Sequence, residues 1–288
     1  MSANKQATVS IRRFNPDTDD KPYYQDYQVE LTPGKTVLDA LEEIKAEQDG
    51  SLTFRRSCRH AICGSCAMMV NRQNTLVCTK PLSAVIGEVG LFRKRNTVVI
   101  EPLPYLPIIK DLVVDRTVFW EQYEKIRPWL IAPDTVPEKE YRMSQEEVDA
   151  MESAETCIMC GACYSACPVV AGNKHYMGPH ALLKAFMRII DPRDQAPDDR
   201  LDMVATETGA FRCHKATNCI DACPKGLNPA KAISNLARAS LRSGRLSAER
   251  AERLKTLIDE MDKSASAIDT REPTPQIMPH TIPIEEKA

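Results

Sequence analysis

The segment Cys157-Ile158-Met159-Cys160-Gly161-Ala162-Cys163-Tyr164-Ser165-Ala166-Cys167-Pro168 carries cysteines at a C-x2-C-x2-C-x3-C-P spacing. The chain has 288 residues and 11 cysteines, and the remaining cysteines fall in two further tight groups. Buried inert cysteines would scatter along the chain, and an odd number argues against a framework of disulfides where thiols are kept reduced. The cysteines are therefore predicted to bind metal.

This spacing is typical of iron-sulfur proteins in which three cysteines hold one cubane cluster and the fourth binds a second cluster. A related segment follows as Cys213-x5-Cys219-x3-Cys223-Pro224, with Ala216 where the middle cysteine would stand. If the last cysteine of each segment binds the cluster of the other segment, a 4Fe-4S cluster receives four thiolates, from Cys157, Cys160, Cys163 and Cys223. The other site receives only Cys167, Cys213 and Cys219. A cubane corner without a thiolate tends to lose its iron, which predicts a 3Fe-4S cluster. The alternative is a 4Fe-4S cluster with water or another oxygen ligand on one iron.

The remaining group is Cys58-x4-Cys63-x2-Cys66 followed by Cys78, the spacing of a plant-type 2Fe-2S cluster. Thiolates on one loop can enclose one side of the cluster, Gly64 allows the backbone to come close, and Cys78 closes the other side from a neighbouring strand. Zinc is the alternative, but it usually takes two pairs of ligands in tetrahedral geometry, which suits this loop less well. The three groups use all 11 cysteines.

The cysteine groups lie in two differently patterned parts of the chain. Alternating strand-like runs stand at 7–14, 27–31, 67–70, 75–78 and 97–100, with a helix over 37–44 that Thr36 can cap. Beyond a proline-rich stretch the pattern is helical, with a capping box at 144–147. The predicted fold class is α+β. The predicted domains are a β-rich one over 1–108, a connecting segment with a helix over 109–142, a helical one over 143–262, and an extended or disordered tail over 263–288.

Charge and hydropathy exclude several classes of protein. Lys and Arg total 38 and Asp and Glu total 40, so the formal charge of −2 lacks the basic excess of a nucleic-acid binder. The most apolar stretch, residues 106–114, is interrupted by Pro107, Lys110 and Asp111 and is too short to span a bilayer. A strand-like run begins almost at once after Met1, so no signal or transit segment is expected. These features predict a cytosolic chain with no nucleic-acid partner and no membrane span.

Taken together, the motifs resemble the iron-sulfur subunit of succinate dehydrogenase and fumarate reductase, from about Val9 to Gly244. The segments that carry the resemblance are Arg13-Phe14-Asn15-Pro16, Phe54-Arg55-Arg56-Ser57-Cys58, Ile62-Cys63-Gly64-Ser65-Cys66, Asp111-Leu112-Val113-Val114-Asp115, Cys157-Ile158-Met159-Cys160-Gly161 and Cys223-Pro224-Lys225-Gly226. The resemblance implies a 2Fe-2S ferredoxin-like domain of β-grasp type, followed by an all-α two-cluster ferredoxin-like domain.

The same resemblance implies an electron relay with no catalytic residue of its own. Electrons would pass from FAD on a flavoprotein subunit through the 2Fe-2S, 4Fe-4S and 3Fe-4S clusters to a quinone beside the membrane-anchor subunits. With no targeting segment expected, this places the chain peripherally on the cytoplasmic face of a bacterial inner membrane. Two other readings stay open: the iron-sulfur subunit of a fumarate reductase or other flavoprotein oxidoreductase, and a freestanding carrier or redox sensor. A subunit, unlike a carrier, should expose apolar patches to its partners.

A quinone pocket is implied beside the 3Fe-4S cluster, at Pro168, the following residues to Gly172, His214 and Ala216. His214 could hydrogen-bond to a quinone oxygen or protonate it, or could tune the cluster. Ala171-Gly172 replaces a tryptophan pair common in ubiquinone-reducing members, so menaquinone and ubiquinone both stay open. In the first cysteine loop, His60-Ala61 replaces the usual Glu-Gly and changes one charge near the 2Fe-2S cluster.

Overall fold

The computed structural model describes residues 6–87, 96–135 and 137–243. The chain divides into a compact unit over 1–240 and a second over 241–288, of which only 241–243 are described. The tail predicted over 263–288, and the end of the helical domain predicted over 143–262, lie outside the described residues.

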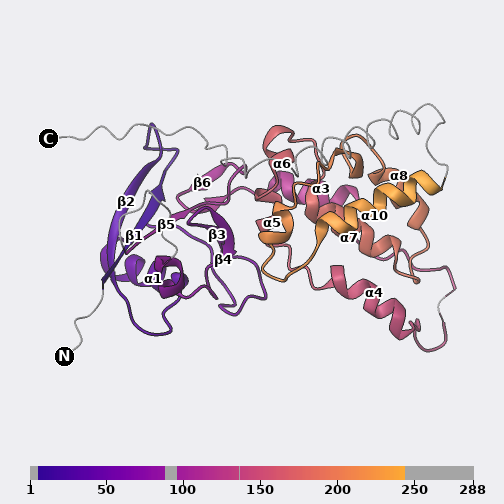
Figure 1. Ribbon diagram of the computed structural model, residues 1–288, viewed down its shortest axis with the longest axis horizontal. Helices are drawn as coiled ribbons and strands as arrows, with labels where there is room; N and C mark the ends of the chain where they lie inside the picture. Colours follow the sequence, from indigo (N-terminus) through magenta and orange to yellow (C-terminus); the bar gives the residue numbers. More distant parts are fainter. Residues whose placement is uncertain (1–5, 88–95, 136, 244–288) are drawn as a thin grey trace, which may run out of the picture. The chain divides into compact units, whose positions relative to one another are not determined.

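A five-stranded mixed sheet forms the first part of the chain, with the strand order β2-β1-β5-β3-β4 (Figure 1). β1 is antiparallel to β2 but parallel to β5, so the chain must cross over the sheet between them. The first two strands pair as neighbours, as predicted. The strands are β1 Gln6–Arg13, β2 Tyr23–Glu30, β3 Ala67–Val70, β4 Gln73–Leu76 and β5 Thr97–Glu101.

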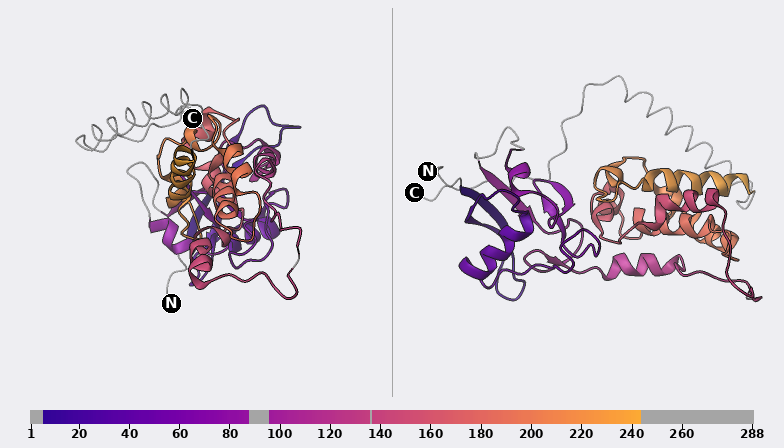
Figure 2. Two further views of the ribbon diagram at one scale, coloured as in Figure 1. Left: turned by 90° about the vertical axis from the view of Figure 1, so that its right-hand side faces the viewer. Right: turned by 90° about the horizontal axis from the view of Figure 1, so that it is seen from below.

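Helix α1, Val37–Glu43, lies in the crossover and packs on one face of the sheet (Figure 2). The Thr36 hydroxyl accepts a hydrogen bond from the Asp39 N–H at 3.1 Å, and the Asp39 carboxylate accepts one from the Thr36 N–H at 3.0 Å. This capping box satisfies amide groups that the first helical turn leaves unpaired. Val37 and Leu41 are fully buried, and a π-helical turn over Ile44–Gln48 continues the helix. The helix and its cap are where the sequence predicted them.

The hairpin from β3 to β4 is tighter than predicted. Asn71 and Arg72 have φ of 49° and 69°, the left-handed conformation of a two-residue turn that matches the twist of its strands. Gln73 and Asn74 were expected in the turn, yet they belong to β4. The predicted strand over 75–78 is therefore wrong at both ends, because cross-strand pairing, rather than side-chain polarity, sets where β4 runs.

Three short elements did not stand out in the sequence: α2, Leu82–Gly87, and the hairpin of β6, Ile108–Lys110, with β7, Val113–Val114. A buried ion pair ties this hairpin to β1, since Arg13 Nε donates to Asp111 Oδ1 at 2.9 Å. The other Asp111 oxygen accepts from the Thr53 N–H at 2.9 Å. A buried pair whose atoms are all hydrogen-bonded costs little and fixes one arrangement. It orients the chain as it leaves the sheet for α3, Thr117–Lys125.

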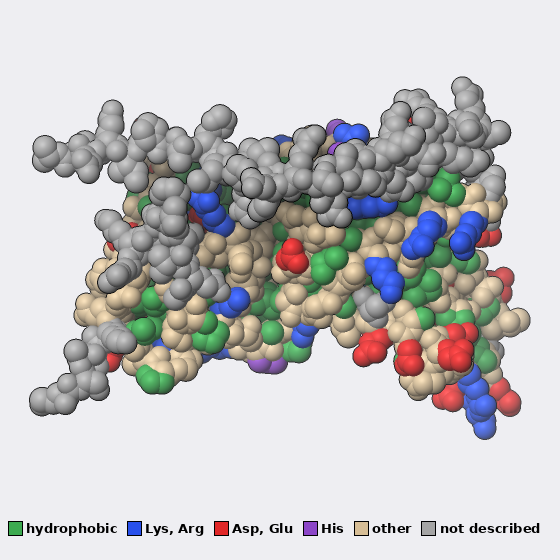
Figure 3. Space-filling view, viewed as in Figure 1, with side chains coloured by type: hydrophobic (Ala, Val, Ile, Leu, Met, Phe, Trp, Pro, Cys, Tyr) green, Lys and Arg blue, Asp and Glu red, His purple; other side chains and the backbone are tan. Residues whose placement is uncertain are grey.

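The second part of the compact unit is helical, which with the sheet confirms the predicted fold class. α7 packs against α3, α4, α5 and α8, and most of its residues are buried. Acidic side chains gather over α4 on the face drawn in Figure 3. The helices are α4 Gln145–Glu155, α5 Ala162–Ser165, α6 Pro168–Gly172, α7 Gly178–Ile189, α8 Pro197–Val204, α9 Asn218–Asp221 and α10 Pro229–Arg242, with a 3-10 turn at Ala210–Arg212.

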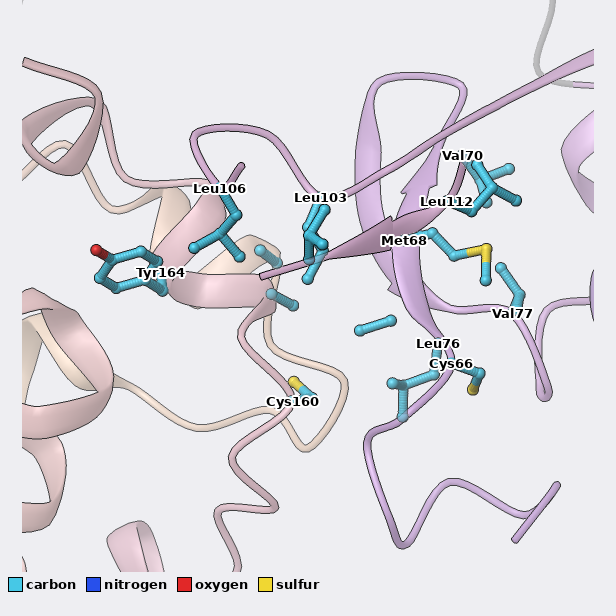
Figure 4. Close-up of a cluster of buried hydrophobic side chains, with 14 of the residues drawn as sticks. Cys66, Met68, Val70, Leu76, Val77, Leu103, Leu106, Leu112, Cys160 and Tyr164 are labelled. Carbon is cyan, nitrogen blue, oxygen red and sulfur yellow. The ribbon is translucent and has the colours of Figure 1, made fainter. Parts of the chain in front are cut away.

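One hydrophobic core continues from the sheet into the helices. In Figure 4 it runs from Met68 on β3 through Leu103 and Leu106, between β5 and β6, to Tyr164 on α5. A hydrogen bond accompanies this contact, because the Asn74 side-chain amide donates to the Ala162 carbonyl at 3.0 Å. The two cysteine-bearing regions are therefore held together by packing as well as by the chain.

Candidate iron-sulfur cluster sites

The loop that precedes β3, residues 55–66 and here called the first loop, turns several backbone amides toward one sulfur. Cys58 Sγ accepts hydrogen bonds from the N–H groups of His60, Ile62 and Cys63 at 3.5, 3.4 and 3.3 Å. These donors stabilise the thiolate and lower the pKa of Cys58 to about 6. The same amides could stabilise the sulfurs of a bound cluster, whose potential such hydrogen bonds tune.

The other cysteines of this group differ in exposure. Cys63 is exposed, whereas Cys66, just before β3, and Cys78, just beyond β4, are buried. Burial raises the pKa of Cys66 to about 12. A neutral buried thiol must lose its proton before it can bind iron. Loading the site is therefore expected to release a proton from Cys66.

These opposite shifts predict unequal thiol reactivity in the iron-free protein. Iodoacetamide attacks the thiolate, so labelling of Cys58 should rise from about pH 5, following its pKa of about 6, and level off above about pH 7. Cys66 should react about tenfold or more slowly across this range, because its pKa lies near 12. Quenched samples analysed by mass spectrometry give both rates. Equal rates at the two cysteines would contradict the buried, neutral state of Cys66.

Ala61 occupies a left-handed backbone position in the first loop, at φ 60°. This conformation is strained for alanine but open to glycine, so Ala61→Gly is expected to stabilise the loop by about 1 kcal/mol, after allowing for the entropy that glycine adds. The midpoint of thermal bleaching of the visible 2Fe-2S absorbance should rise. Ala67→Gly is the control, since a glycine inside β3 should lower that midpoint. A fall in both variants would show that Ala61 is not strained.

Four of the remaining cysteines surround one space in the helical part. This space, hollow A, measures about 360 Å³ when the part open to solvent is included. It is lined by residues from three segments, among them Cys157, Cys160, Cys163 and Cys223. Cys157 follows α4, Cys160 precedes α5, and Cys223 follows α9. Cys223, from the second cysteine segment, therefore lines the same space as three cysteines of the first segment.

The last three cysteines line a second space, hollow B, which measures about 320 Å³ when the part open to solvent is included. Its walls include Cys167, Cys213, Cys219, Pro168, His214, Ala216 and Tyr176. Pro168, His214 and Ala216 are exposed, so the predicted quinone residues stand where hollow B meets solvent. Gly172 does not share that place: it is exposed at the end of α6 and is not among the residues that line hollow B.

The donor sets fit clusters better than single ions. Among the residues that the structure describes, no three His, Cys, Asp or Glu side chains are placed to share one metal ion. The cysteines instead line two shared hollows, four of them around one and three around the other, as a cluster with several iron atoms requires. Burial raises the pKa of both Cys160 and Cys219 to about 11, and it also raises the pKa values of Cys157, Cys163 and Cys167. Iron must therefore displace protons here too.

Two side chains at these spaces were not singled out by the sequence motifs. Tyr176 is 1% exposed at the wall of hollow B, which it shares with Cys167, Cys213 and Cys219, and burial raises the pKa of its hydroxyl. His180 lines hollow A, stacks on Phe119 at 3.8 Å between ring centroids, and donates through Nε2 to the Phe119 carbonyl at 2.8 Å. Burial lowers the pKa of His180 to about 3, so the ring is neutral. No spacing rule in the sequence could have found either residue, because both are placed by tertiary packing.

Comparisons with known proteins agree with this arrangement. The family of 2Fe-2S iron-sulfur cluster binding domains matches residues 8–121, and the family of 4Fe-4S dicluster domains matches residues 153–227. No helix in the described part of the chain is long and apolar enough to cross a membrane.

Individual relatives cover most of the chain. The succinate dehydrogenase iron-sulfur subunit of Paracoccus denitrificans is 42% identical over 80% of this chain and 88% of its own. Iron-sulfur subunit 1 of the mitochondrial succinate dehydrogenase [ubiquinone] of rice, Oryza sativa subsp. japonica, is 44% identical over 81% of this chain and 82% of its own. A chain of the Mycobacterium smegmatis Sdh1 complex in the apo form is 27% identical and superposes with a TM-score of 0.71, covering 82% of this chain and 98% of that one. Because this chain carries a 2Fe-2S domain followed by a 4Fe-4S dicluster domain, and because it is 42–44% identical to these subunits, it belongs to the succinate dehydrogenase iron-sulfur subunits.

Proposed function

We propose that this chain, as the electron-transfer subunit of a succinate dehydrogenase, passes electrons from FAD on a flavoprotein subunit through three clusters to a membrane quinone. The observation that carries the proposal is the sorting of the cysteines into three separate sets. The proposed ligands are Cys58, Cys63, Cys66 and Cys78 for the 2Fe-2S cluster, Cys157, Cys160, Cys163 and Cys223 for the 4Fe-4S cluster, and Cys167, Cys213 and Cys219 for the 3Fe-4S cluster.

The neighbours of each proposed site support such a relay. A Cβ added to Gly64 in the first loop would come within 2.8 Å of Cys160 Cβ, so the first loop touches the wall of hollow A. Cys163, in the first turn of α5, lines hollow A, and Cys167, just beyond α5, lines hollow B. The clusters would supply one-electron carriers between a two-electron flavin and a two-electron quinone. The protein's own task is to hold, space and hydrogen-bond them.

The quinone is proposed to bind at the mouth of hollow B. Pro168, His214 and Ala216 are exposed there, and the His214 imidazole can hydrogen-bond to a quinone oxygen. Gly172 carries less of this proposal, because it lies outside the lining of hollow B. The proposal covers both menaquinone and ubiquinone.

Two exposed regions support two protein partners. In the first loop Ile62 is 56% exposed, an apolar side chain suited to a contact with the flavoprotein. The mouth of hollow B is the side proposed to face the membrane-anchor subunits, because a quinone reaches it from the lipid. We place the chain peripherally on the cytoplasmic face of a bacterial inner membrane, as its family resemblance implies. The comparisons do not favour a fumarate reductase subunit over this assignment.

Electron paramagnetic resonance (EPR) of the anaerobically isolated complex tests the proposed function. The oxidised sample should show a 3Fe-4S signal at low temperature. Succinate should remove that signal while a reduced 2Fe-2S signal grows in. An oxidised sample without the 3Fe-4S signal would refute the three-thiolate assignment of hollow B. A 3Fe-4S signal that stays unchanged after succinate is added would refute the proposed electron donor.

A further inference from the structure

Arg116, just before α3, reaches the backbone that carries a proposed 4Fe-4S ligand. Its Nη2 donates a hydrogen bond to the Met159 carbonyl. The same nitrogen lies 3.2 Å from where a Cβ on Gly161 would stand. Met159 and Gly161 are the two neighbours of Cys160 in the chain, and all three line hollow A. The guanidinium is therefore packed against the outside of the hollow A wall.

The Arg116 guanidinium is a partly buried cation that has no carboxylate partner among the described residues. Its Nε is buried and has no hydrogen-bond partner. Within the described residues, no Asp or Glu oxygen comes within ion-pair distance of it. It lies instead over two aromatic rings, with Cζ 4.5 Å from the Phe119 centroid and 5.4 Å from that of Trp120. Aromatic faces offset part of the cost of burying a cation, but not all of it.

Two buried arginines of this chain, unlike Arg116, each pair with a carboxylate. Arg13 pairs with Asp111 at 2.9 Å and Arg200 pairs with Asp194 at 2.7 Å. Desolvation lowers the pKa of Arg116, and the nearby Cys160 and Cys163 sulfurs act in the opposite direction. A cluster held by four thiolates is anionic in both of its oxidation states. Such a group in hollow A would supply the negative charge that Arg116 otherwise lacks.

The other charged groups near hollow A do not play the same part. Lys225 lines hollow A, but it is partly exposed and its Nζ is not a buried donor left without a partner. Lys184 is buried, but its Nζ donates to the carbonyls of Ala154 and Glu155 at 3.1 and 3.2 Å, at the end of α4. His180 is neutral and hydrogen-bonded to Phe119. Arg55 is exposed, so water and salt screen its charge. Arg116 is the cation whose unmet donor and missing carboxylate both point to the cluster.

We infer that Arg116 is the electrostatic counter-charge of the 4Fe-4S cluster and raises the reduction potential of that cluster. The inference rests on the ligand set of the proposed function. Reduction adds a negative charge to the cluster, and a cation held beside it in a poorly solvated wall stabilises the reduced form more than the oxidised form. Arg116 would thus favour electron transfer into the 4Fe-4S cluster through its charge, without binding iron itself.

Redox titration of the assembled complex, followed by EPR, tests this inference with three variants. Arg116→Met removes the charge but keeps an apolar chain against Phe119, Arg116→Lys keeps the charge, and Arg55→Met removes an exposed charge. At a fixed potential, the ratio of reduced to oxidised 4Fe-4S cluster should fall about tenfold in Arg116→Met, which is 59 mV for a one-electron couple. It should fall less in Arg116→Lys and stay unchanged in Arg55→Met. The 2Fe-2S and 3Fe-4S clusters should keep their potentials.

The outcomes separate this inference from the proposed function. An intact 4Fe-4S cluster with an unchanged potential in Arg116→Met overturns the inference alone. So does loss of the cluster in both Arg116 variants, because packing and not charge would then be needed. Loss in Arg116→Met with retention in Arg116→Lys supports it in a stronger form. A wild-type complex without any 4Fe-4S signal overturns the proposed ligand set, and the inference falls with it.

Discussion

Gly64→Ala is expected to push the first loop away from hollow A and to slow electron transfer between the two clusters proposed there. Gly64 has φ 69°, and an added Cβ would meet Cys160 Cβ at 2.8 Å and Cys160 Cα at 2.9 Å. Neither atom can move without moving the backbone that carries a proposed ligand. Overpacking together with the left-handed backbone should cost about 2–5 kcal/mol of stability.

Two measurements and a matched control test this expectation. The thermal midpoint of cluster bleaching reports stability, and rapid-freeze EPR after succinate addition reports how fast the 4Fe-4S cluster follows the 2Fe-2S cluster. Gly34→Ala is the control: its φ is 82°, but a Cβ there meets nothing within 4 Å. It should cost only the backbone strain, about 1 kcal/mol, and leave electron transfer unchanged. Equal effects of the two variants would mean that the contact between Gly64 and Cys160 is not tight.

The parts of the fold that the sequence predicted correctly are those with local causes. Thr36 and Asp39 cap α1 through bonds three residues apart, and Ser144 and Glu147 do the same for α4. The β6–β7 hairpin was missed because its cause is remote. Asp111 holds φ 48° and pairs with Arg13, which is 98 residues away in the chain. Such long-range contacts leave no periodic pattern in the sequence.

In the proposed cluster sites, too, the features with local causes could be predicted and those with long-range causes could not. Ligand spacing groups the cysteines because several thiolates on one loop must reach one cluster, and the structure gathers the same cysteines around hollows A and B. Ligand spacing does not predict the places of Arg116 and Tyr176. Arg116 donates to the Met159 carbonyl from 43 residues earlier, and Tyr176 lines hollow B from outside both cysteine segments. Only the packed helices bring these polar atoms to the wall.

Ala216→Cys is expected to convert the 3Fe-4S cluster proposed in hollow B into a 4Fe-4S cluster. Ala216 lines hollow B between Cys213 and Cys219, and the left-handed backbone of Lys215 and Thr217, φ 55° and 59°, curves the loop around that space. A thiol at position 216 would restore the fourth ligand that the spacing lacks. The oxidised sample should then lose its 3Fe-4S signal, and the purified complex should hold one more iron per chain.

Electron flow to the quinone should fall in the same variant, since a new cluster type changes the potential of the last carrier. Each 59 mV changes the equilibrium for reducing that cluster about tenfold. Ala216→Val, which adds bulk without a thiol, should keep the 3Fe-4S signal and the iron content. The alternative, a 4Fe-4S cluster with an oxygen ligand, predicts different results for the wild-type complex and for Ala216→Cys. In that case the wild-type complex would show no oxidised signal, and Ala216→Cys would add no iron, because the fourth iron is already there.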